Sequence, residues 1–245
     1  MEVFSKSDIG RKRISNQDRE AHGTVSEDMV WTIVCDGMGG FNGGDVASET
    51  ATETMKEYFE KNLNASCEDE KIHDVMYEAS HLANDKIYEM SKNNSDLSGM
   101  GTTVVACVLK GGTAHIMSAG DSRAYLVGKD SISQLTVDHS VVQNMIDSGE
   151  ITPEEAHDHP QKNIITRALG VEPSISLDYK KLQAHQGDFI LLCTDGLTNY
   201  LGSLKIYEMF KKFSVSEIPE KLISESNKRG GKDNVTVSII SCKSN

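Results

Sequence analysis

The sequence predicts an α+β fold in four layers, an αββα sandwich of two antiparallel β-sheets with an antiparallel helix pair on each outer face. Three observations lead to it. Two one-sided helical segments come first, several short β-type runs follow, and two more helical segments and a last β-type run close the chain. This segregated order differs from the βαβ alternation of a parallel sheet. Helices on both outer faces of the sheets are the economical arrangement that would bury every one-sided apolar stripe.

The first third of the chain combines a β-type start with the two helical segments. Residues 1–20 are polar and β-type at their start, and residues 30–35 form an apolar run that ends on Asp36. After a Gly-rich turn, apolar side chains recur at helical spacing over residues 44–61 and, beyond a polar break, over residues 70–92. Both patterns predict helices that lie on a flat apolar surface.

The middle of the chain is rich in β-type residues. Short runs at 102–109, 114–118, 124–127 and 132–135 are separated by polar or Gly-containing turns, which predicts an antiparallel meander. The first of these runs is apolar without alternation, as in a strand buried on both faces. Residues from 138 to about 160 are polar and weakly helical, and we interpret them as a small flap.

The last third returns to β-type runs and helices. Strands are predicted at 175–182, 189–193 and 235–242, and helices at 204–213 and 216–228. We find no repeat or linker, so residues 1–245 are expected to form a single domain.

Composition excludes several classes of protein. A net charge of −12 disfavours nucleic-acid binding. No apolar run approaches the roughly 18 residues of a membrane helix, and the N-terminus lacks a signal-peptide pattern. Five cysteines without paired spacing argue against a disulfide framework or a zinc site. We expect a cytoplasmic protein, a monomer without a membrane partner.

Five aspartates occupy similar places in the sequence. Each adjoins a β-type run and sits in a Gly-rich or polar turn: Asp18, Asp36, Asp121, Asp195 and Asp233. Taken singly, each is an ordinary turn residue. Together at one end of a sandwich they would repel one another unless cations neutralised them. Carboxylates with an exposed glycine carbonyl suit a hard divalent ion such as Mg²⁺ or Mn²⁺.

The motifs around these aspartates resemble one known family. They are Gly10-x-x-Arg13-x-x-Asn16-Gln17-Asp18, Asp36-Gly37-Met38-Gly39-Gly40, Gly101-Thr102-Thr103, Gly120-Asp121-Ser122-Arg123, Asp138-His139-Ser140, Arg167-Ala168-Leu169-Gly170, Thr194-Asp195-Gly196-Leu197 and Asp233-Asn234-Val235-Thr236. The chain resembles the metal-dependent type-2C serine/threonine protein phosphatases, particularly the compact bacterial members, over residues 9–240.

The resemblance implies a set of metal ligands. Asp36 would bridge two ions and Gly37 would offer its carbonyl to one of them, while Asp195 and Asp233 would complete the other. Asp121, together with Asp195, would hold a third, weaker ion near the flap. Asp18, with Gln17 behind it, would hold metal-bound waters. The ions would be Mn²⁺ or Mg²⁺, with Mn²⁺ giving the best activity.

The resemblance also implies a reaction. A hydroxide that bridges the two ions would attack the phosphorus of phosphoserine or phosphothreonine in line, without a phosphoenzyme. Asp36, Asp195 and Arg13 would be catalytic, the two aspartates as ligands of these ions. Arg13 would bind the substrate phosphate and stabilise charge on its oxygens, to which its planar, always charged fork is suited. The partners would be phosphorylated proteins, among them a bacterial serine/threonine kinase whose action the chain opposes.

Several residues have open roles. Many eukaryotic relatives have a histidine at the position of Met38, and this histidine is thought to protonate the leaving group. Bacterial relatives commonly have a methionine there, as this chain does. The general acid is therefore open between His139, His159 and a metal-bound water.

Other motif residues are expected to support the site. Thr102 and Thr103 would support the strand beneath the ions, and Arg123 would pair with an acid. Arg167 would support the fold or contact substrate, and Asn234 would orient its neighbouring aspartate or a water, or only shape a turn.

Two other functions are compatible with the fold. A catalytically inactive module that binds phosphoproteins would be expected to lose some of the aspartates, yet all are present. A phosphatase for one dedicated phosphoprotein, or for a small phosphoester, would keep the same site.

Overall fold

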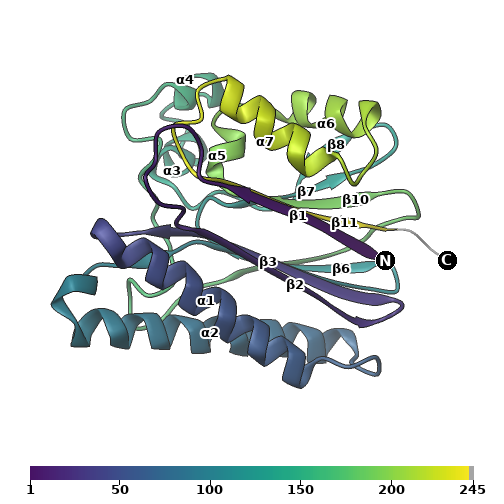
Figure 1. Cartoon of the computed structure of the whole chain (residues 1–245), viewed down its shortest axis with the longest axis horizontal. Helices are drawn as coiled ribbons and strands as arrows, with labels where there is room; N and C mark the ends of the chain where they lie inside the picture. The colour runs from purple at the N-terminus through teal and green to yellow at the C-terminus, as the bar shows by residue number, and fades with distance from the viewer. Residues whose placement is uncertain (243–245) are drawn as a thin grey trace.

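Two antiparallel sheets face each other in the computed structural model, which describes residues 1–242 (Figure 1). One sheet has the order β1 (Glu2–Asp8), β11 (Val235–Ser241), β10 (Phe189–Cys193), β7 (Arg123–Val127) and β8 (Ile132–Gln134). The other has the order β2 (Asp18–Ser26), β3 (Met29–Met38), β5 (Val104–Lys110), β6 (Thr113–Ala119) and β9 (Asp178–Gln183), and the short β4 (Gly101–Thr102) pairs with the end of β3.

Helices cover both outer faces, which confirms the predicted four layers (Figure 1). The β2–β9 sheet carries α1 (Gly40–Asn62) and α2 (Asp69–Asn93), and the short η1 (Ser95–Leu97) follows them. The β1–β8 sheet carries α6 (Ser203–Lys212) and α7 (Ile218–Lys228). The two long helices lie within four residues of the bounds expected from their apolar spacing.

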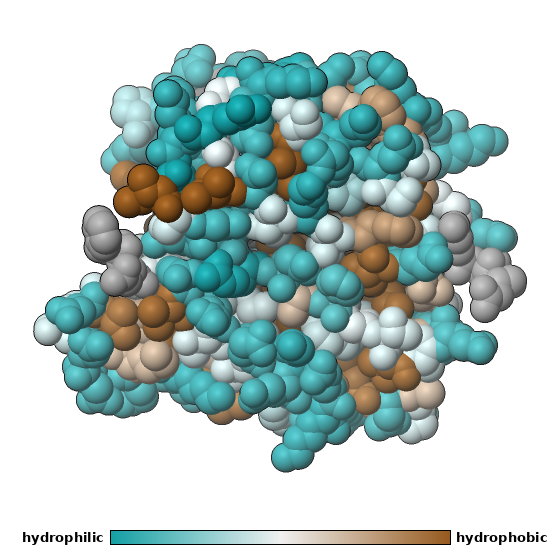
Figure 2. Space-filling model, in the orientation of Figure 1, coloured by the Kyte–Doolittle hydropathy of each residue, from teal (hydrophilic) through white to brown (hydrophobic). Residues whose placement is uncertain are grey.

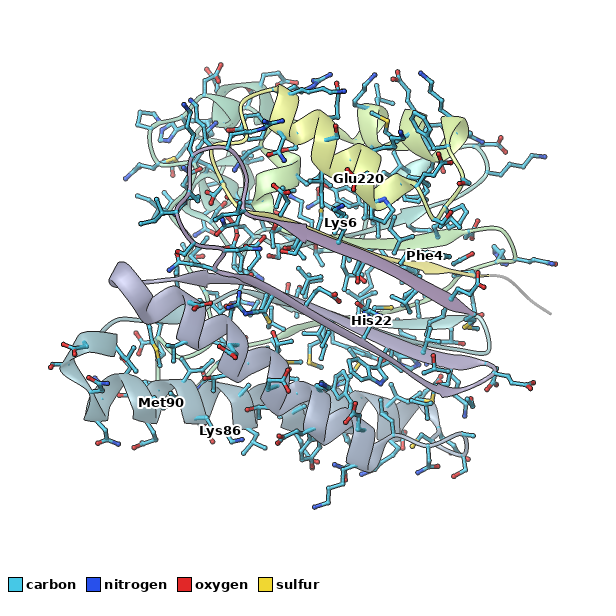
Figure 3. The ribbon with its side chains drawn as sticks, in the orientation of Figure 1. Phe4, Lys6, His22, Lys86, Met90 and Glu220 are labelled. Carbon is cyan, nitrogen blue, oxygen red and sulfur yellow. The ribbon has the colours of Figure 1, made fainter. Side chains whose placement is uncertain are left out.

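The core is divided into three apolar layers, and β3 contributes to two of them because its side chains alternate between the two faces of its sheet. Val30 and Val34 face the space between the sheets, whereas Trp31 and Ile33 face the α1–α2 layer. There Trp31 meets Phe59 edge to face, with 5.5 Å between the ring centroids. At the outer face of the other sheet, Lys6 of β1 pairs with Glu220 of α7 (Figure 3).

The predicted meander is wrong in one respect, because the chain changes sheets between β6 and β7. The strands β5 and β6 belong to one sheet, whereas β7 and β8 belong to the other. The change occurs at Gly120, whose φ is 111° and where a Cβ would lie 2.6 Å from Thr103 Cγ2. A side chain at this position would clash, so glycine permits the crossing. Asp121 consequently sits where the two sheets meet.

Local patterns missed two elements of the fold. The polar strand β2 carries little apolar signal, yet it pairs with β3 along most of its length. The short helix α5 (Asp195–Thr198) follows β10 directly. Strand β9 begins at Asp178, three residues later than the expected 175.

The inserted segment after β8 has the helical character that its spacing predicts. It contains α3 (Val141–Asp147) and α4 (Pro153–His157), and a capping box at Thr152 and Glu155 begins the second. A bridge between Ser140 and Ile165 closes its base.

All five cysteines are buried and none forms a disulfide. Within residues 1–242, no helix has the length and apolar character needed to cross a membrane.

Candidate active site

The five aspartates come together at one end of the sandwich. Asp18 and Asp36 lie directly opposite each other on β2 and β3. Asp121 lies in the β6–β7 crossing, Asp195 begins α5, and Asp233 lies two residues before β11. Asp36 is close enough to the other four for their charges to act on it. The structure therefore brings together every aspartate that the sequence singled out.

Backbone contacts hold Asp36 in place. Its N–H donates to Thr103 Oγ1 at 3.0 Å, and its carbonyl accepts from the Thr103 N–H and from Thr102 Oγ1, both at 2.9 Å. The two threonines thus support the strand end, as expected. Gly37 packs against Gly44, since a Cβ on Gly37 would lie 2.0 Å from the Gly44 carbonyl oxygen.

Burial and mutual repulsion oppose the charged forms of these carboxyl groups. Burial, reinforced by the neighbouring aspartates, raises the pKa of Asp36 well above its usual range. The same causes, burial first, raise the pKa of Asp18 to about 7, of Asp121 to about 7 and of Asp195 to about 6. Without cations, the cluster must bind protons to relieve the repulsion.

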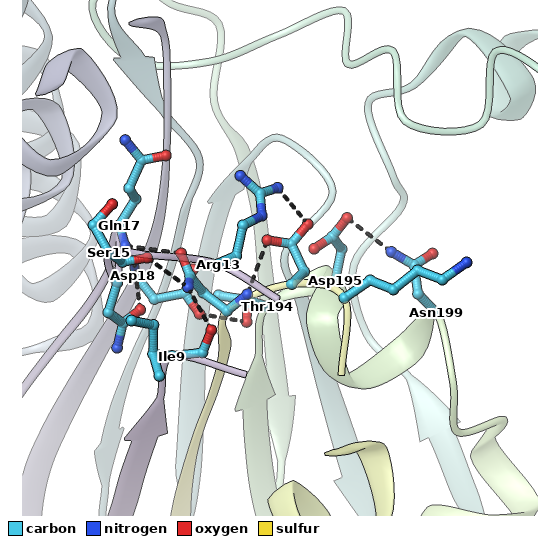
Figure 4. Close-up of polar contacts among 12 residues, drawn as sticks. Ile9, Arg13, Ser15, Gln17, Asp18, Thr194, Asp195 and Asn199 are labelled. Atoms are coloured by element: carbon cyan, nitrogen blue, oxygen red, sulfur yellow. Dashed lines mark hydrogen bonds and ion pairs between the residues drawn. The ribbon is translucent and has the colours of Figure 1, made fainter. Parts of the chain in front are cut away.

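Two buried carboxylate oxygens have no hydrogen-bond partner among the described residues: Asp18 Oδ1 and Asp195 Oδ1. Their sister oxygens are held, since Thr194 Oγ1 donates to Asp18 Oδ2 and Asn199 Nδ2 donates to Asp195 Oδ2, both at 2.9 Å (Figure 4). Oriented carboxylates with one free oxygen each fit a divalent cation. The sequence did not identify Asn199, because the short helix α5, which places this side chain one turn after Asp195, was not predicted.

The cluster is too open to enclose an ion with side chains alone. Within residues 1–242, no three His, Cys, Asp or Glu side chains converge closely enough to hold one ion. Water and a backbone carbonyl would have to complete each coordination shell, which is normal for Mg²⁺ and acceptable to Mn²⁺. The donor set therefore fits hydrated hard cations.

Arg13 lies at the rim of the cluster and pairs with Asp233. The two side chains are 2.8 Å apart, and 47% of the Arg13 side chain is exposed (Figure 4). A guanidinium here partly balances the charge of the aspartates, and its exposed side is open to solvent. This places Arg13 beside the predicted metal ligands, where a phosphate oxygen could reach both.

Asn234 acts as a clamp on the segment that carries Arg13, the β1–β2 loop (residues 9–17). Its Nδ2 donates to the carbonyls of Ile9 at 2.9 Å and Ser15 at 3.0 Å, and its Oδ1 accepts from the Gln17 N–H at 2.8 Å (Figure 4). The expected roles toward Asp233 or a water did not anticipate this clamp. Its partners lie more than 200 residues away, beyond the reach of local patterns.

Arg123 ties the Asp121 loop to the start of the flap. It donates to both oxygens of Asp138 at 2.6–3.0 Å, so the expected acidic partner is now identified. A cavity of about 340 Å³ lies beside this pair. Its walls come from the site, through Asp121 and Asp195, and from the flap, through Val142, Ile146 and Ala156.

His139 has both ring nitrogens engaged. Nδ1 accepts from the Gly120 N–H at 3.0 Å, and Nε2 faces Arg167 and Asp178. Burial, with the adjacent guanidinium, lowers the pKa of His139, which favours the neutral ring. Arg167 pairs with Asp178 at 2.7 Å. Of the two roles expected for Arg167, this contact corresponds to support of the fold. These contacts fix the Asp121 loop and leave the general acid unassigned.

A larger cavity lies elsewhere. It measures about 540 Å³ and is lined by Met1, Cys242 and the turns that join β2 to β3 and β5 to β6, at the opposite end of the sandwich. The carboxylates that line it are Glu27 and Asp28, adjacent exposed residues of a single turn, and none of the five aspartates of the cluster is among its lining residues. We place the reaction at the aspartate end because the chemistry, rather than the volume, identifies the site.

Comparison with known proteins agrees with this site. The family model for protein phosphatase 2C matches residues 9–227. The Listeria innocua serine/threonine phosphatase stp is 38% identical over 241 residues, which cover 98% of this chain and 95% of that protein. The Streptococcus pneumoniae protein phosphatase PhpP is 34% identical over 247 residues, covering 98% and 97%.

Solved structures are also similar over nearly their whole length. The Staphylococcus aureus serine/threonine phosphatase Stp1 has 31% identity and a TM-score of 0.92, and the match covers 99% of this chain and 95% of that one. The catalytic domain of phosphatase PstP, crystallised with two manganese ions, has 31% identity and a TM-score of 0.83, with 97% and 96% covered. The chain belongs to the protein phosphatase 2C family, as its motifs predicted.

Proposed function

We propose that this chain is a metal-dependent protein phosphatase that hydrolyses phosphoserine and phosphothreonine in other proteins. The observation that carries the proposal is the convergence of five aspartates from separate segments, two with free buried oxygens, in a chain of this family. A binding module would have no need to keep so costly a cluster of buried acids.

The ligand assignment is the one that the resemblance to the family implies, and the convergence of the five aspartates supports it. Asp36 would bridge two ions, the Gly37 carbonyl would bind one, and Asp195 and Asp233 would bind the other. Asp121 and Asp195 would hold a third ion beside the flap, and Asp18 would orient bound water. When present, Mn²⁺ or Mg²⁺ ions lower the pKa of a bound water and neutralise charge on phosphoryl oxygens.

The chain's own residues would orient the substrate. Arg13 would exchange its contact with Asp233 for a contact with the phosphate, once cations balance that carboxylate. Asn234 would keep the β1–β2 loop, and hence Arg13, in register with the ligands. Thr194 and Asn199 would keep the carboxylates of Asp18 and Asp195 aimed into the site.

The wider setting follows from the same proposal. The substrates would be phosphorylated proteins, including a serine/threonine kinase whose action this phosphatase opposes. The whole chain would act as one catalytic domain, a cytoplasmic monomer, with residues 138–160 as its flap.

The direct test is hydrolysis of a phosphothreonine peptide by metal-stripped protein, with Mn²⁺ or Mg²⁺ added back, with and without an okadaic-type inhibitor. We expect turnover only with metal, best with Mn²⁺, and unaffected by the inhibitor. An absence of turnover by fully metal-loaded protein would favour the binding module, and hydrolysis of small phosphoesters alone would favour the narrower substrate class.

A further inference from the structure

Two loops at the edge of the site carry an uncompensated group of positive charges. They are the β1–β2 loop and the α7–β11 loop (residues 229–234), which run side by side in Figure 1. Four exposed cations lie on these loops and on the adjoining end of α7: Arg11, Lys12, Lys228 and Lys232. We call this group the basic rim. Figure 2 shows strongly hydrophilic side chains over this part of the surface.

The two loops are in direct contact through glycines. The Arg11 N–H donates to the Gly231 carbonyl at 2.7 Å. A Cβ on Gly231 would lie 2.7 Å from Arg11 Cγ, and one on Gly10 would lie 2.1 Å from the Asp233 carbonyl. Their φ values of 53° and 82° also favour glycine. Cations from opposite ends of the sequence are therefore held next to each other and next to Asp233.

No acid neutralises the rim in this structure. None of its four members forms an ion pair with another of the described residues, 1–242. The acids close by in sequence are engaged elsewhere. Asp8 accepts from the Gly10 N–H and from Asn227, Glu225 pairs with Arg229, and Asp233 pairs with Arg13. This stands out in a chain whose net charge is −12.

The rim also adjoins the phosphate position. Lys12 precedes Arg13 in the chain, and Lys232 precedes Asp233. The backbone of Lys232 is fixed, since its N–H donates to the Tyr200 hydroxyl at 3.1 Å. An extended substrate segment advances about 3.3 Å per residue. When the phosphorylated residue of a substrate is held at Arg13, the substrate residues a few positions before or after it therefore reach the rim.

We propose that the basic rim binds acidic residues that flank the phosphorylated residue, so that acidic segments of phosphoproteins are the preferred substrates. This inference rests on the proposed function and names its substrate class. Complementary charges beside a site raise the rate of productive encounter and fix the orientation of the bound segment. Salt screens the long-range repulsion from the chain's net negative charge over about 10 Å at 0.1 M, so a local cluster can dominate.

The test compares three phosphothreonine peptides of equal length with p-nitrophenyl phosphate, all with Mn²⁺-loaded protein. One peptide is neutral, one has four glutamates before the phosphothreonine, and one has four after it. At about 0.05 M salt we expect kcat/KM for one acidic peptide to exceed the neutral value about tenfold. At about 1 M salt, where the screening length is about 3 Å, the preference should disappear.

A charge-matched pair of variants localises the effect. In Lys12→Gln/Lys228→Gln/Lys232→Gln, we expect the preference to fall to about twofold, with hydrolysis of p-nitrophenyl phosphate unchanged. The control, Lys61→Gln/Lys71→Gln/Lys180→Gln, removes the same charge from exposed, unpaired lysines on the other sheet and its helices. It should keep the full preference.

Each outcome decides the proposal. Equal rates on all three peptides, or a preference that persists in the rim variant or at high salt, would overturn it. The salt series uses only the unaltered protein, so the test stands even if the rim variant folds poorly. If no substrate, p-nitrophenyl phosphate included, is hydrolysed with metal, the proposed function itself fails, which is a distinct result.

Discussion

The middle of the sandwich and its acidic end differ in what stabilises them, and the acidic end is less uniformly buried: Asp18 is buried, whereas Asp36, Asp121 and Asp195 are half-buried. On β3, Val30 and Val34 face the space between the sheets, and Asp36 continues the same face two residues later. Val34 is fully buried and Asp18, opposite Asp36, is 2% exposed. The apolar half is stable as it stands, whereas the acidic half depends on protons or cations. One strand face thus combines a core with a reactive site.

The largest expected effect comes from changing Asp36, which would break the acidic half. For Asp36→Asn we expect metal-dependent activity to fall by more than the roughly 10–100-fold that losing an outer metal partner costs. The metal-free protein should at the same time become more stable, because a buried like charge is removed. Steady-state kinetics and thermal melts would measure both. Asp130→Asn, in an exposed turn, is the control. Full activity in Asp36→Asn would contradict the ligand assignment.

The stability of the acidic half should depend on pH and on metal, whereas that of the apolar half should not. The pKa of Asp18 is raised from 3.8 to about 7, so the folded state holds a proton that the unfolded state has released between these values. The resulting stability is complete below the lower value and is lost as pH rises through the higher one. Metal-free protein should therefore melt at a lower temperature at pH 7.5 than at pH 5.5.

Metal should reverse this loss. An ion at about 100 times its dissociation constant adds about 2.7 kcal/mol, which corresponds to about 5–10 °C in a chain of this size. We expect the rise with Mn²⁺ to be larger at pH 7.5, where protons compete less. Calorimetry at both pH values measures it, and Asp18→Asn/Asp121→Asn should weaken the fall with pH in metal-free protein. A metal-free melting temperature that does not fall would contradict the account.

Truncating a side chain of the apolar half should have effects opposite to those of Asp36→Asn, with stability lowered and activity retained. Val34→Ala removes methyl groups from a fully buried position, which should cost about 2 kcal/mol of unfolding free energy. Activity per folded molecule should stay within about twofold, because no contact with the ligands changes. Denaturant unfolding and kinetics on the same sample would check both. A large loss of activity at full folding would show that the two halves are coupled.

At the clamp on the β1–β2 loop we expect a smaller loss of activity than in Asp36→Asn. Asn234→Ala removes three hydrogen bonds, and a typical hydrogen bond contributes about 1 kcal/mol to the free energy of unfolding. The loss of these bonds makes the β1–β2 loop, and with it Arg13, less well positioned. We therefore expect KM for a phosphopeptide to rise about tenfold, equivalent to about 1.4 kcal/mol, with a smaller change in kcat. Asn62→Ala, at the far end of α1, is the control. A fall in kcat alone would instead indicate a role toward Asp233.

Several features were predictable from local sequence. Apolar spacing predicted α1 and α2 nearly to their ends, and the continuous apolar run at 104–109 is fully buried. The five aspartates were identified because each has the same local setting, a β-type run beside a polar turn. In these cases the signal lies within one or two turns of the residue, where side-chain period and turn chemistry decide the conformation.

Other features could not be read from local patterns. Strand β2 is polar because it is an edge strand whose pairing, not its composition, defines it. The meander was wrong because a strand's period says which side chains share a face and nothing about which sheet it joins. The clamp by Asn234 depends on partners that only the fold brings near. The support from Asn199 depends on the unpredicted helix α5, which places this side chain one turn after Asp195.

By itself, the sequence determined the family, the four-layer architecture and the set of acidic side chains, because these depend on residue types and short spacings. The tertiary structure alone decided that Asp18 faces Asp36, that Arg13 pairs with Asp233 and that Arg123 pairs with Asp138. It also decided the raised pKa values, since burial and charge–charge distances belong to the packed chain. The same holds for the basic rim, whose cations meet only because two distant loops pack through glycines.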